Sequence, residues 1–235
     1  MGEEVSIRVN FSNPMPLFPL DSVVLLPQQV MPLHIHEPRY CQMVEHALDG
    51  PGQIAMATFK GNRWKTEYHG NPPVRPAVCI GQIAQHEKLP DGRYNLLLQG
   101  VCRATIVREH MPDEQHLYRR ATLEPVGVGI VAGDEPERVR TWIDEHLAEG
   151  ELSRMAVAEQ IAEFVRNDEV PTDAALELVA FAMLTQSETR YRLLAEGDVN
   201  RRARMIQTEL KRLRSLISRA MQQHPEEWPK GVSWN

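Results

Sequence analysis

Short apolar runs separated by turn residues fill the first half of the chain and predict a β-rich region. Runs of this kind, bounded by proline, glycine, asparagine or aspartate, are typical of strands. Five prolines fall within residues 16–40. Proline cannot donate to a sheet ladder, so these strands are expected to use edges, strand starts and bulges. The pattern predicts strands at 16–20, 23–26, 30–35, 53–59, 78–86, 94–99, 101–107 and 117–125.

Turn and helix signals between these runs define the connections. Pro38 suits the first turn of a helix, where its missing N–H has no partner to lose, and this helix is expected to end by Gly50. Asp91 and Gly92 predict a hairpin turn with positive φ at both residues. Gly100 interrupts an apolar run and predicts a β-bulge.

Apolar positions recur every three or four residues in the second half, which predicts an almost wholly helical region. The third predicted helix is the most apolar and is expected to be the central, buried one. Ser187 and Asp198 are expected to be the N-caps of the last two helices, and the tail from His224 is not expected to be helical. The predicted helices are 136–149, 153–167, 172–185, 187–195 and 198–222.

These patterns predict an α+β fold. An N-terminal β-rich pseudo-barrel subdomain with one helix is expected at 1–128, followed by a C-terminal helical bundle at 129–222 and an irregular tail at 223–235. A chain of 235 residues is long enough for two modest domains, and a hydrophobic content of 42% is enough to build their cores.

Charge and composition argue against several classes of protein. The net charge of −6, from 26 basic and 32 acidic residues, argues against a nucleic-acid partner. We expect no transmembrane helix, because no apolar run reaches about eighteen residues, and no signal peptide, because the N-terminus is acidic. Cys41, Cys79 and Cys102 are an odd set without paired spacing. They predict reduced thiols in a cytoplasmic protein.

Two blocks of the first half carry a family resemblance. Residues 16–40 contain Phe-Pro-Leu, Val-Val-Leu-Leu-Pro, Pro-Leu-x-Ile and Glu-Pro-Arg-Tyr, and residues 81–103 contain Gly-x-Ile, Pro-Asp-Gly and Gly-x-x-Arg. This order resembles the N-terminal domain of Lon proteases, known as the Lon substrate-binding domain, although His36 stands where that family usually has an aromatic residue. The motif positions, for which we expect structural roles, are Pro19, Pro27, Glu37, Pro38, Arg39, Tyr40, Gly81, Asp91, Gly92 and Gly100.

The resemblance implies recognition without catalysis. Full Lon proteases continue into an ATPase module and a serine–lysine protease module. This sequence has no Gly-x-x-x-x-Gly-Lys-Ser/Thr segment to hold phosphates and nothing similar to the serine–lysine region. We therefore expect a stand-alone, non-catalytic module, without cofactor or metal, that binds exposed apolar or unfolded polypeptide segments. A protease is the expected further partner, and a homo-oligomer would strengthen weak contacts through avidity.

A long polar loop at 60–76 holds the residues best suited to contact a peptide. Long loops with their own aromatic residues are often functional. Trp64 and Tyr68, together with Phe59 at the end of the preceding strand, would supply large apolar contacts. The alternative is that these rings cover the edge of the barrel.

Two patterns point instead to an uncharacterised hydrolase. Cys41 lies near the start of a helix, where the helix dipole would activate a thiol nucleophile. Lys211 and Ser215 lie one helical turn apart, a spacing that mimics a serine–lysine dyad. The alternatives are a buried structural cysteine and a solvated helix surface.

Two further patterns suggest binding of other partners. His34 and His36 face the same side of a strand, but a metal site would need more ligands nearby, and a polar strand face is the simpler interpretation. The last helix would let a scaffold bind an acidic partner or nucleic acid, with a solvated face as the alternative. Its basic residues are Arg201, Arg202, Arg204, Lys211, Arg212, Arg214 and Arg219.

Overall fold

A computed structural model describes residues 7–67 and 70–222 and confirms the α+β class. The described residues group into two compact units. The first comprises the residues up to Ile130 together with Thr185–Asp198, and the second comprises Val131–Leu184 and the residues from Val199 onward. No helix in the described ranges is long and apolar enough to cross a membrane.

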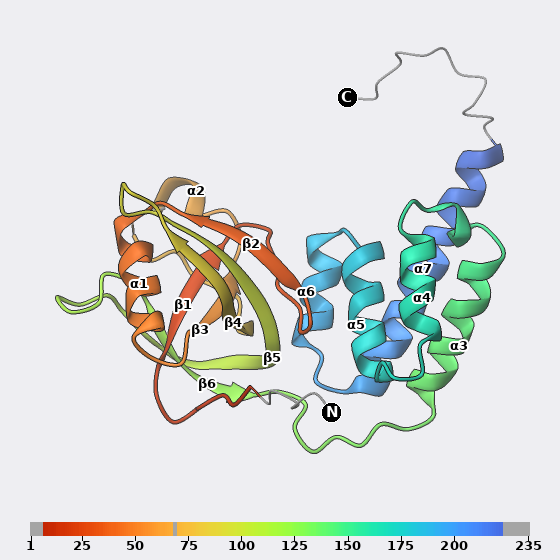
Figure 1. The fold of residues 1–235 in the computed structure, drawn as a ribbon, viewed down its shortest axis with the longest axis horizontal. Helices are drawn as coiled ribbons and strands as arrows, with labels where there is room; N and C mark the ends of the chain where they lie inside the picture. The colour runs from red at the N-terminus through yellow and green to blue at the C-terminus, as the bar shows by residue number, and fades with distance from the viewer. Residues whose placement is uncertain (1–6, 68–69, 223–235) are drawn as a thin grey trace, which may run out of the picture. The chain divides into compact units, whose positions relative to one another are not determined.

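Five strands of the first unit close into a small barrel (Figure 1). Neighbours pair in the order β5-β4-β3-β1-β6, and a second pairing between β5 and β6 closes the ring. The β1–β3 pair is parallel, whereas the other pairs are antiparallel. The predicted pseudo-barrel is therefore confirmed. The strands are β1 (Met15–Leu20), β3 (Gln53–Thr58), β4 (Ala77–Lys88), β5 (Tyr94–His110) and β6 (Arg120–Pro125).

Small side chains fill much of the barrel interior. A ring of so few strands leaves a narrow core, and Ala55, Ala57, Ala104 and Ala121 are all buried within it. Larger residues close the remaining space. These are Met15, Leu17, Phe59, Val74, Val78, Ile80 and Leu123.

The long strand β5 joins the barrel to an extension of the same sheet. Its second half pairs with β6 inside the barrel, whereas its first half pairs with β2 (Val30–Ile35) and with the end of β4. This three-stranded β2–β5–β4 extension buries Ile35, Tyr94 and Leu96 on one face. Helix α1 (Pro38–Leu48) is tied to it, since the Tyr94 hydroxyl donates to Glu45 at 3.0 Å.

The predicted strand at 23–26 is wrong. These residues form a buried loop, because their backbone groups bond to side chains and turns rather than to a strand. The Leu26 N–H donates to the Gln29 side chain at 3.0 Å, and the Val23 carbonyl accepts from the Thr58 hydroxyl at 3.2 Å. Positive φ angles at Ser22 and Gln28, of 57° and 68°, bend the chain at both ends.

The hairpin between β4 and β5 uses a different turn from the one predicted. Only Gly92 has a positive φ, at 87°, whereas both turn residues were expected to have one. The Gly92 N–H donates to the Leu89 carbonyl and the Leu89 N–H to the Arg93 carbonyl. This pattern fits a type I turn followed by a left-handed glycine. The predicted bulge at Gly100 is confirmed by the register shift opposite Ile80 and Gly81.

Three other boundaries differ from the predictions. The loop at 60–76 contains a one-turn helix, α2 (Trp64–Glu67). Strand β6 starts at Arg120 rather than at 117. The predicted helix 153–167 is divided into a short 3-10 turn, η1 (Leu152–Arg154), and helix α4 (Ala158–Arg166).

The second unit is helical, and its apolar helix is central as expected. Helix α5 (Thr172–Met183) packs against α3 (Glu135–Ala148), α4 and α7 (Val199–Gln222). It buries Val179 and Ala180 completely, in keeping with its composition.

Helix α6 (Ser187–Ala195) packs with the barrel unit. The sequence pattern instead predicts it in the helical bundle at 129–222. Arg103 on β5 donates to the Leu193 carbonyl at 3.2 Å, and the Tyr191 hydroxyl accepts from the Ala77 N–H at 3.0 Å. Ser187 is not the N-cap of this helix. The N-cap is Gln186, and the Ser187 hydroxyl donates to the Ser22 carbonyl at 2.6 Å.

Candidate functional site

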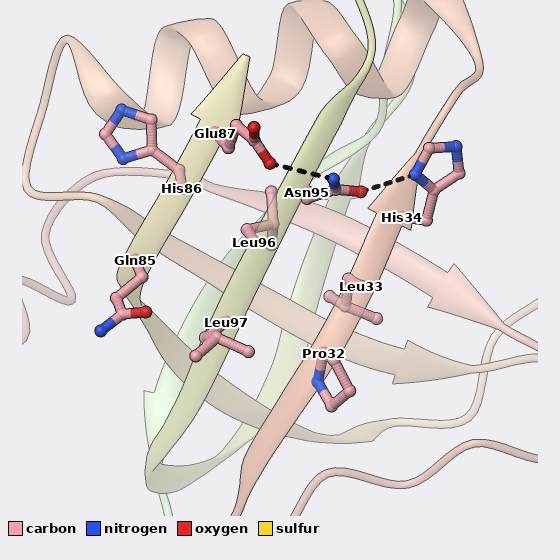
Figure 2. A pocket seen from close by; sticks show the side chains of 9 residues that line it. All are labelled: Pro32, Leu33, His34, Gln85, His86, Glu87, Asn95, Leu96 and Leu97. Atoms are coloured by element: carbon pink, nitrogen blue, oxygen red, sulfur yellow. Dashed lines mark hydrogen bonds between the residues drawn. The ribbon is translucent and has the colours of Figure 1, made fainter. Parts of the chain in front are cut away.

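The outer face of the β2–β5–β4 extension carries an open hollow of about 450 Å³. Pro32, Leu97 and Gln85 form one row across the three strands, and their side chains lie on the same face because neighbouring strands are in register (Figure 2). The bulge after Ile83 sets this register on β4. The lining residues are Pro32, Leu33, His34, Gln85, His86, Glu87, Asn95, Leu96 and Leu97.

A chain of polar contacts bounds one end of the hollow (Figure 2). Asn95 donates to Glu87 at 3.2 Å, and its carbonyl oxygen accepts from His34 Nδ1 at 2.8 Å. Arg93, itself paired with Asp91, then donates to His34 Nε2 at 3.2 Å. This geometry corresponds to the His34 tautomer that is protonated on Nδ1. The hollow therefore joins an apolar floor to a polar rim.

Strand β2 offers a free edge beside the hollow. In the described part of the chain it pairs with β5 alone. Backbone groups alternate in direction along an antiparallel pair, and the Gly100 N–H points to β2, where it bonds to Gln29. Val30, Pro32 and His34 therefore direct their backbone groups toward the free edge. Because Pro32 has no N–H, the edge offers three backbone carbonyl acceptors but only two N–H donors.

His34 on β2 and His36, just beyond the end of that strand, lie on the same side, as predicted. Their rings are stacked, with centroids 6.1 Å apart and planes inclined by 18°. Within the described ranges, no group of three or more His, Cys, Asp or Glu side chains is arranged to hold a metal ion. The structure therefore assigns His34 to the polar rim, and His36 stacks beside it.

The aromatic residues predicted to contact a peptide lie elsewhere. Trp64 is half-buried and stacks on Phe59, with ring centroids 6.0 Å apart and planes inclined by 9°. Phe59 belongs to the barrel core, and Trp64 packs against it. Tyr68 lies outside the described residues. Peptide contact by this loop remains a prediction.

The family-motif positions hold the barrel unit together in several ways. Pro38 is in the first turn of α1, Glu37 precedes that helix, and Arg39 donates back to the Glu37 carboxylate at 2.9 Å. Tyr40 packs edge-to-face on Phe18. Pro19 pairs with Ala57 across β1 and β3, and Pro27 is buried.

Glycine motif positions permit close approaches. A Cβ on Gly81 would lie 2.6 Å from the Leu98 side chain, and one on Gly100 would lie 2.1 Å from the Leu26 carbonyl oxygen. Asp91 caps the hairpin by accepting from the Arg93 N–H at 3.2 Å.

The surroundings of Cys41 do not activate a nucleophile. Its thiol lies 3.8 Å from the Ile35 carbonyl oxygen. Burial raises the pKa of the Cys41 thiol, and the carboxylates of Glu45 and Asp91 raise it further. A raised pKa reduces the thiolate fraction at neutral pH, which is the reactive form.

We expect Cys41 to be alkylated by iodoacetamide at pH 7.5 more slowly in the folded protein than in the denatured chain. The rate would be followed by mass spectrometry of the Cys41 peptide, with the same protein in denaturant as the control. Alkylation faster in the folded protein would reveal an activated thiol and revive the hydrolase hypothesis.

Lys211 and Ser215 do not form a dyad. The Ser215 hydroxyl donates to the Lys211 main-chain carbonyl at 3.1 Å, and the Lys211 ammonium donates to Gln207 at 3.1 Å. The lysine also lies over the Trp142 ring, 5.4 Å from its centroid. The two side chains therefore bond to other groups of the helical unit rather than to each other.

Acidic residues of the same unit neutralise much of the basic face of α7. Arg202 pairs with Glu177 at 3.3 Å, and both side chains are almost buried. Further ion pairs join Arg204 to Glu135, Arg212 to Glu209 and Arg214 to Glu151. This arrangement favours a structural face over a scaffold for an acidic partner.

Comparison with known proteins assigns the chain to a class and then to a family. The small barrel, its open sheet face and the helices that follow define an α+β protein. The chain belongs to the family of the ATP-dependent protease La (LON) substrate-binding domain, whose model matches residues 14–212. The chain is 28% identical over 179 residues to the Lon protease of Heliobacterium modesticaldum, covering 63% of this chain and 22% of that protein. It is 25% identical over 241 residues to the Lon protease of Escherichia coli K12, covering 97% and 29%. It thus spans less than a third of these relatives' length.

Solved structures share the fold. The N-terminal domain of the Mycobacterium avium complex Lon protease superposes with a TM-score of 0.63 at 19% identity, covering 83% of this chain and 96% of that one. A Lon N-terminal domain protein from Xanthomonas campestris gives a TM-score of 0.54 at 20% identity, with the same coverage. The expected family and its fold are confirmed.

Sequence reasoning missed the hollow itself. The alternation of Asn95, Leu97 and Gln99 between buried neighbours indicates an outward-facing leucine in a polar row. That signal is visible in the sequence. The partners of Leu97 on β2 and β4 depend on the register across three strands, which the pattern does not supply.

Proposed function

We propose that this chain is a non-catalytic protein-recognition module that binds exposed apolar segments of unfolded polypeptides in the hollow beside β2. The observation that carries the proposal is the juxtaposition of Pro32 and Leu97 with a free strand edge. Membership in a substrate-binding family supports it. Soluble domains rarely leave an apolar sheet face and an open edge side by side without a partner.

An extended segment would use both features. Its backbone would pair with the outward groups of Val30 and His34, and alternate side chains would lie over the apolar floor. The missing donor at Pro32 limits the number of backbone bonds. Each contact is therefore weak and tolerant of sequence, as a receptor for many unfolded chains requires.

Weak single contacts favour assembly. Linking several such modules, through a homo-oligomer or through a protease partner, would raise the overall affinity without new contacts. Because the relatives are named Lon protease, we infer that a protease acts on the polypeptides this module retains.

We expect Leu97→Asp to weaken binding of a labelled, permanently unfolded model protein about tenfold or more, because it removes an apolar contact and places a charge on the floor of the hollow. The measurement is fluorescence anisotropy. Val107→Asp is the matched control, since Val107 lies on the same strand, is 55% exposed and lies outside the hollow.

The outcomes separate two sites. Binding that survives Leu97→Asp but disappears in Trp64→Ala would move the site to the loop at 60–76. Absence of binding by the wild-type chain at micromolar concentrations would contradict the function itself.

A further inference from the structure

A second cavity, of about 340 Å³, lies in the barrel unit away from the residues that line the hollow. Its polar lining includes His46 from α1 and three residues near the start of β6, namely His116, Tyr118 and Arg120, and is completed by Asn10, Asn13 and Gln53. Met15 and Pro16 on β1 contribute apolar lining. Pro16 pairs directly with Arg120 across β1 and β6, so the arginine begins beside the apolar part of the lining.

The described lining of this cavity contains one permanently basic side chain and no acidic one. No aspartate or glutamate is among its described lining residues, although the chain carries a net charge of −6. The hollow beside β2, by contrast, includes Glu87. The Arg120 guanidinium and two imidazoles therefore line a common space, and this arrangement suits a carboxylate that shares Arg120 with Asp113.

Hydrogen bonds behind the cavity hold these groups in place. Asp113 accepts from His116 Nδ1 at 3.0 Å and from Arg120 Nη2 at 3.1 Å, and also from two main-chain N–H groups. The hydrogen bond from His116 holds the pKa of Asp113 below its usual range. Asp113 is not a lining residue. It holds His116 and Arg120 in place, and as the ion-pair partner of Arg120 it also offsets part of that residue's charge.

Donor capacity remains on the lining side. Among the described residues, Arg120 Nη1 has no hydrogen-bond partner. The Nε of the same residue also lacks one there, but it is buried and offers no donor that a ligand in the cavity can reach. His46 bonds to the Tyr118 hydroxyl through Nδ1 at 2.9 Å. The His46 ring lies edge-to-face with that of His116, with centroids 5.5 Å apart. The Nε2 atoms of both histidines have no partner in the described part of the chain. Because His116 donates from Nδ1 to Asp113, its ring in the neutral form presents Nε2 as an acceptor.

We propose that this cavity binds a monocarboxylate that carries an apolar group. A guanidinium group matches the planar, bidentate geometry of a carboxylate, and the proline and methionine wall accommodates an apolar body. The volume is in the range of small-ligand sites. One permanent cation suits a monoanion better than a phosphate dianion, and the apolar wall disfavours inorganic anions. The carboxylate would come either from the C-terminal residue of a polypeptide or from a free organic acid.

The test uses the full chain and four probes. These are N-acetyl-leucine, N-acetyl-leucinamide, and a pentapeptide ending in leucine with either a free or an amidated C-terminus. Binding is followed by titration calorimetry and by the imidazole NMR signals of His46 and His116. We expect an acid to bind at least tenfold more tightly than its amide and to shift both imidazole signals.

Variants test the assigned cation. Arg120→Gln should weaken acid binding about tenfold or more, the loss of one charge-assisted contact. Arg108→Gln is the matched control, because Arg108 is exposed on β5 and does not line the cavity. The ratio of acid affinity to amide affinity is measured on the wild-type chain. The proposal can therefore be tested even if the Arg120→Gln protein does not fold.

The four probes distinguish the two sources of the carboxylate and can also contradict the proposal. Tight binding of the peptide acid alone identifies a chain-end site, whereas equal binding of N-acetyl-leucine identifies a site for free acids. Equal binding of acids and amides, or no binding of any probe at millimolar concentration, would overturn the proposal. These results are independent of the Leu97→Asp experiment, so either proposal can fail alone.

Discussion

Replacing Gly100 with alanine is expected to destabilise the barrel unit by more than about 3 kcal/mol, because no space exists for a side chain there. A Cβ would lie 2.1 Å from the Leu26 carbonyl oxygen and 3.2 Å from the Cys79 sulfur. The neighbouring backbone cannot move aside freely. The Gly100 N–H donates to Gln29 at 2.8 Å, and the Gly100 carbonyl accepts from Gln28 at 2.9 Å. Relief of the clash would therefore break the link between β5 and the loop before β2.

Urea denaturation followed by circular dichroism would measure this loss. Gly50→Ala is the matched control, because a Cβ at Gly50 would meet nothing closer than 3.6 Å and the residue has an ordinary φ. We expect that variant to stay within about 0.5 kcal/mol of the wild type. A Gly100→Ala protein as stable as Gly50→Ala would show that the loop at 23–29 is not packed as described.

The same loop shows where sequence patterns succeed and where they fail. Apolar periodicity correctly predicted β2 at 30–35 and helix α1 from Pro38, because each buries one face and its residues follow the period of the element. The run at 23–26 is equally apolar. It is a loop because two side chains bond to its backbone in place of a neighbouring strand. One comes from Gln29, three residues further along, and the other from Thr58, which is distant in sequence.

Long-range pairing explains the remaining differences. Gly100 indicates the bulge in β5, but nothing local in the sequence indicates that this strand pairs with β2, β4 and β6. The return of α6 to the barrel depends on Arg103 and Ala77, which are about a hundred residues earlier in the chain. Periodicity predicts that α6 is a helix but not which surface it covers.

The candidate site was harder to predict than the fold for a related reason. Aromatic residues drew attention to Trp64, yet that ring packs on Phe59. The hollow is instead built from Pro32, Leu97 and Gln85, residues without chemical distinction that become a surface only through register. Recognition surfaces made from sheet faces are therefore poorly visible in a single sequence, whereas the family resemblance was visible through prolines and glycines with local roles.

Arg140→Met is expected to lower the stability of the helical unit by about 2–4 kcal/mol, because one guanidinium group holds the connection between α4 and α5. Arg140 on α3 donates to the carbonyls of Val165, Asn167 and Val170 at 2.6–2.8 Å, and to the Thr172 hydroxyl at 2.8 Å. Methionine retains much of the apolar stem but satisfies none of these acceptors. The last turn of α4 and the first turn of α5 should therefore separate first.

Hydrogen exchange followed by mass spectrometry would locate the effect, since protection should fall at 165–175 before it falls in the barrel. Arg138→Met is the matched control. Arg138 lies two residues earlier on the same helix and is exposed, and its side chain has no hydrogen bond or ion pair among the described residues. Equal loss of protection in both variants would mean that the charge of α3, rather than the contacts of Arg140, stabilises the connection. Unchanged protection in Arg140→Met would mean that apolar packing of α4 and α5 is sufficient without the guanidinium group.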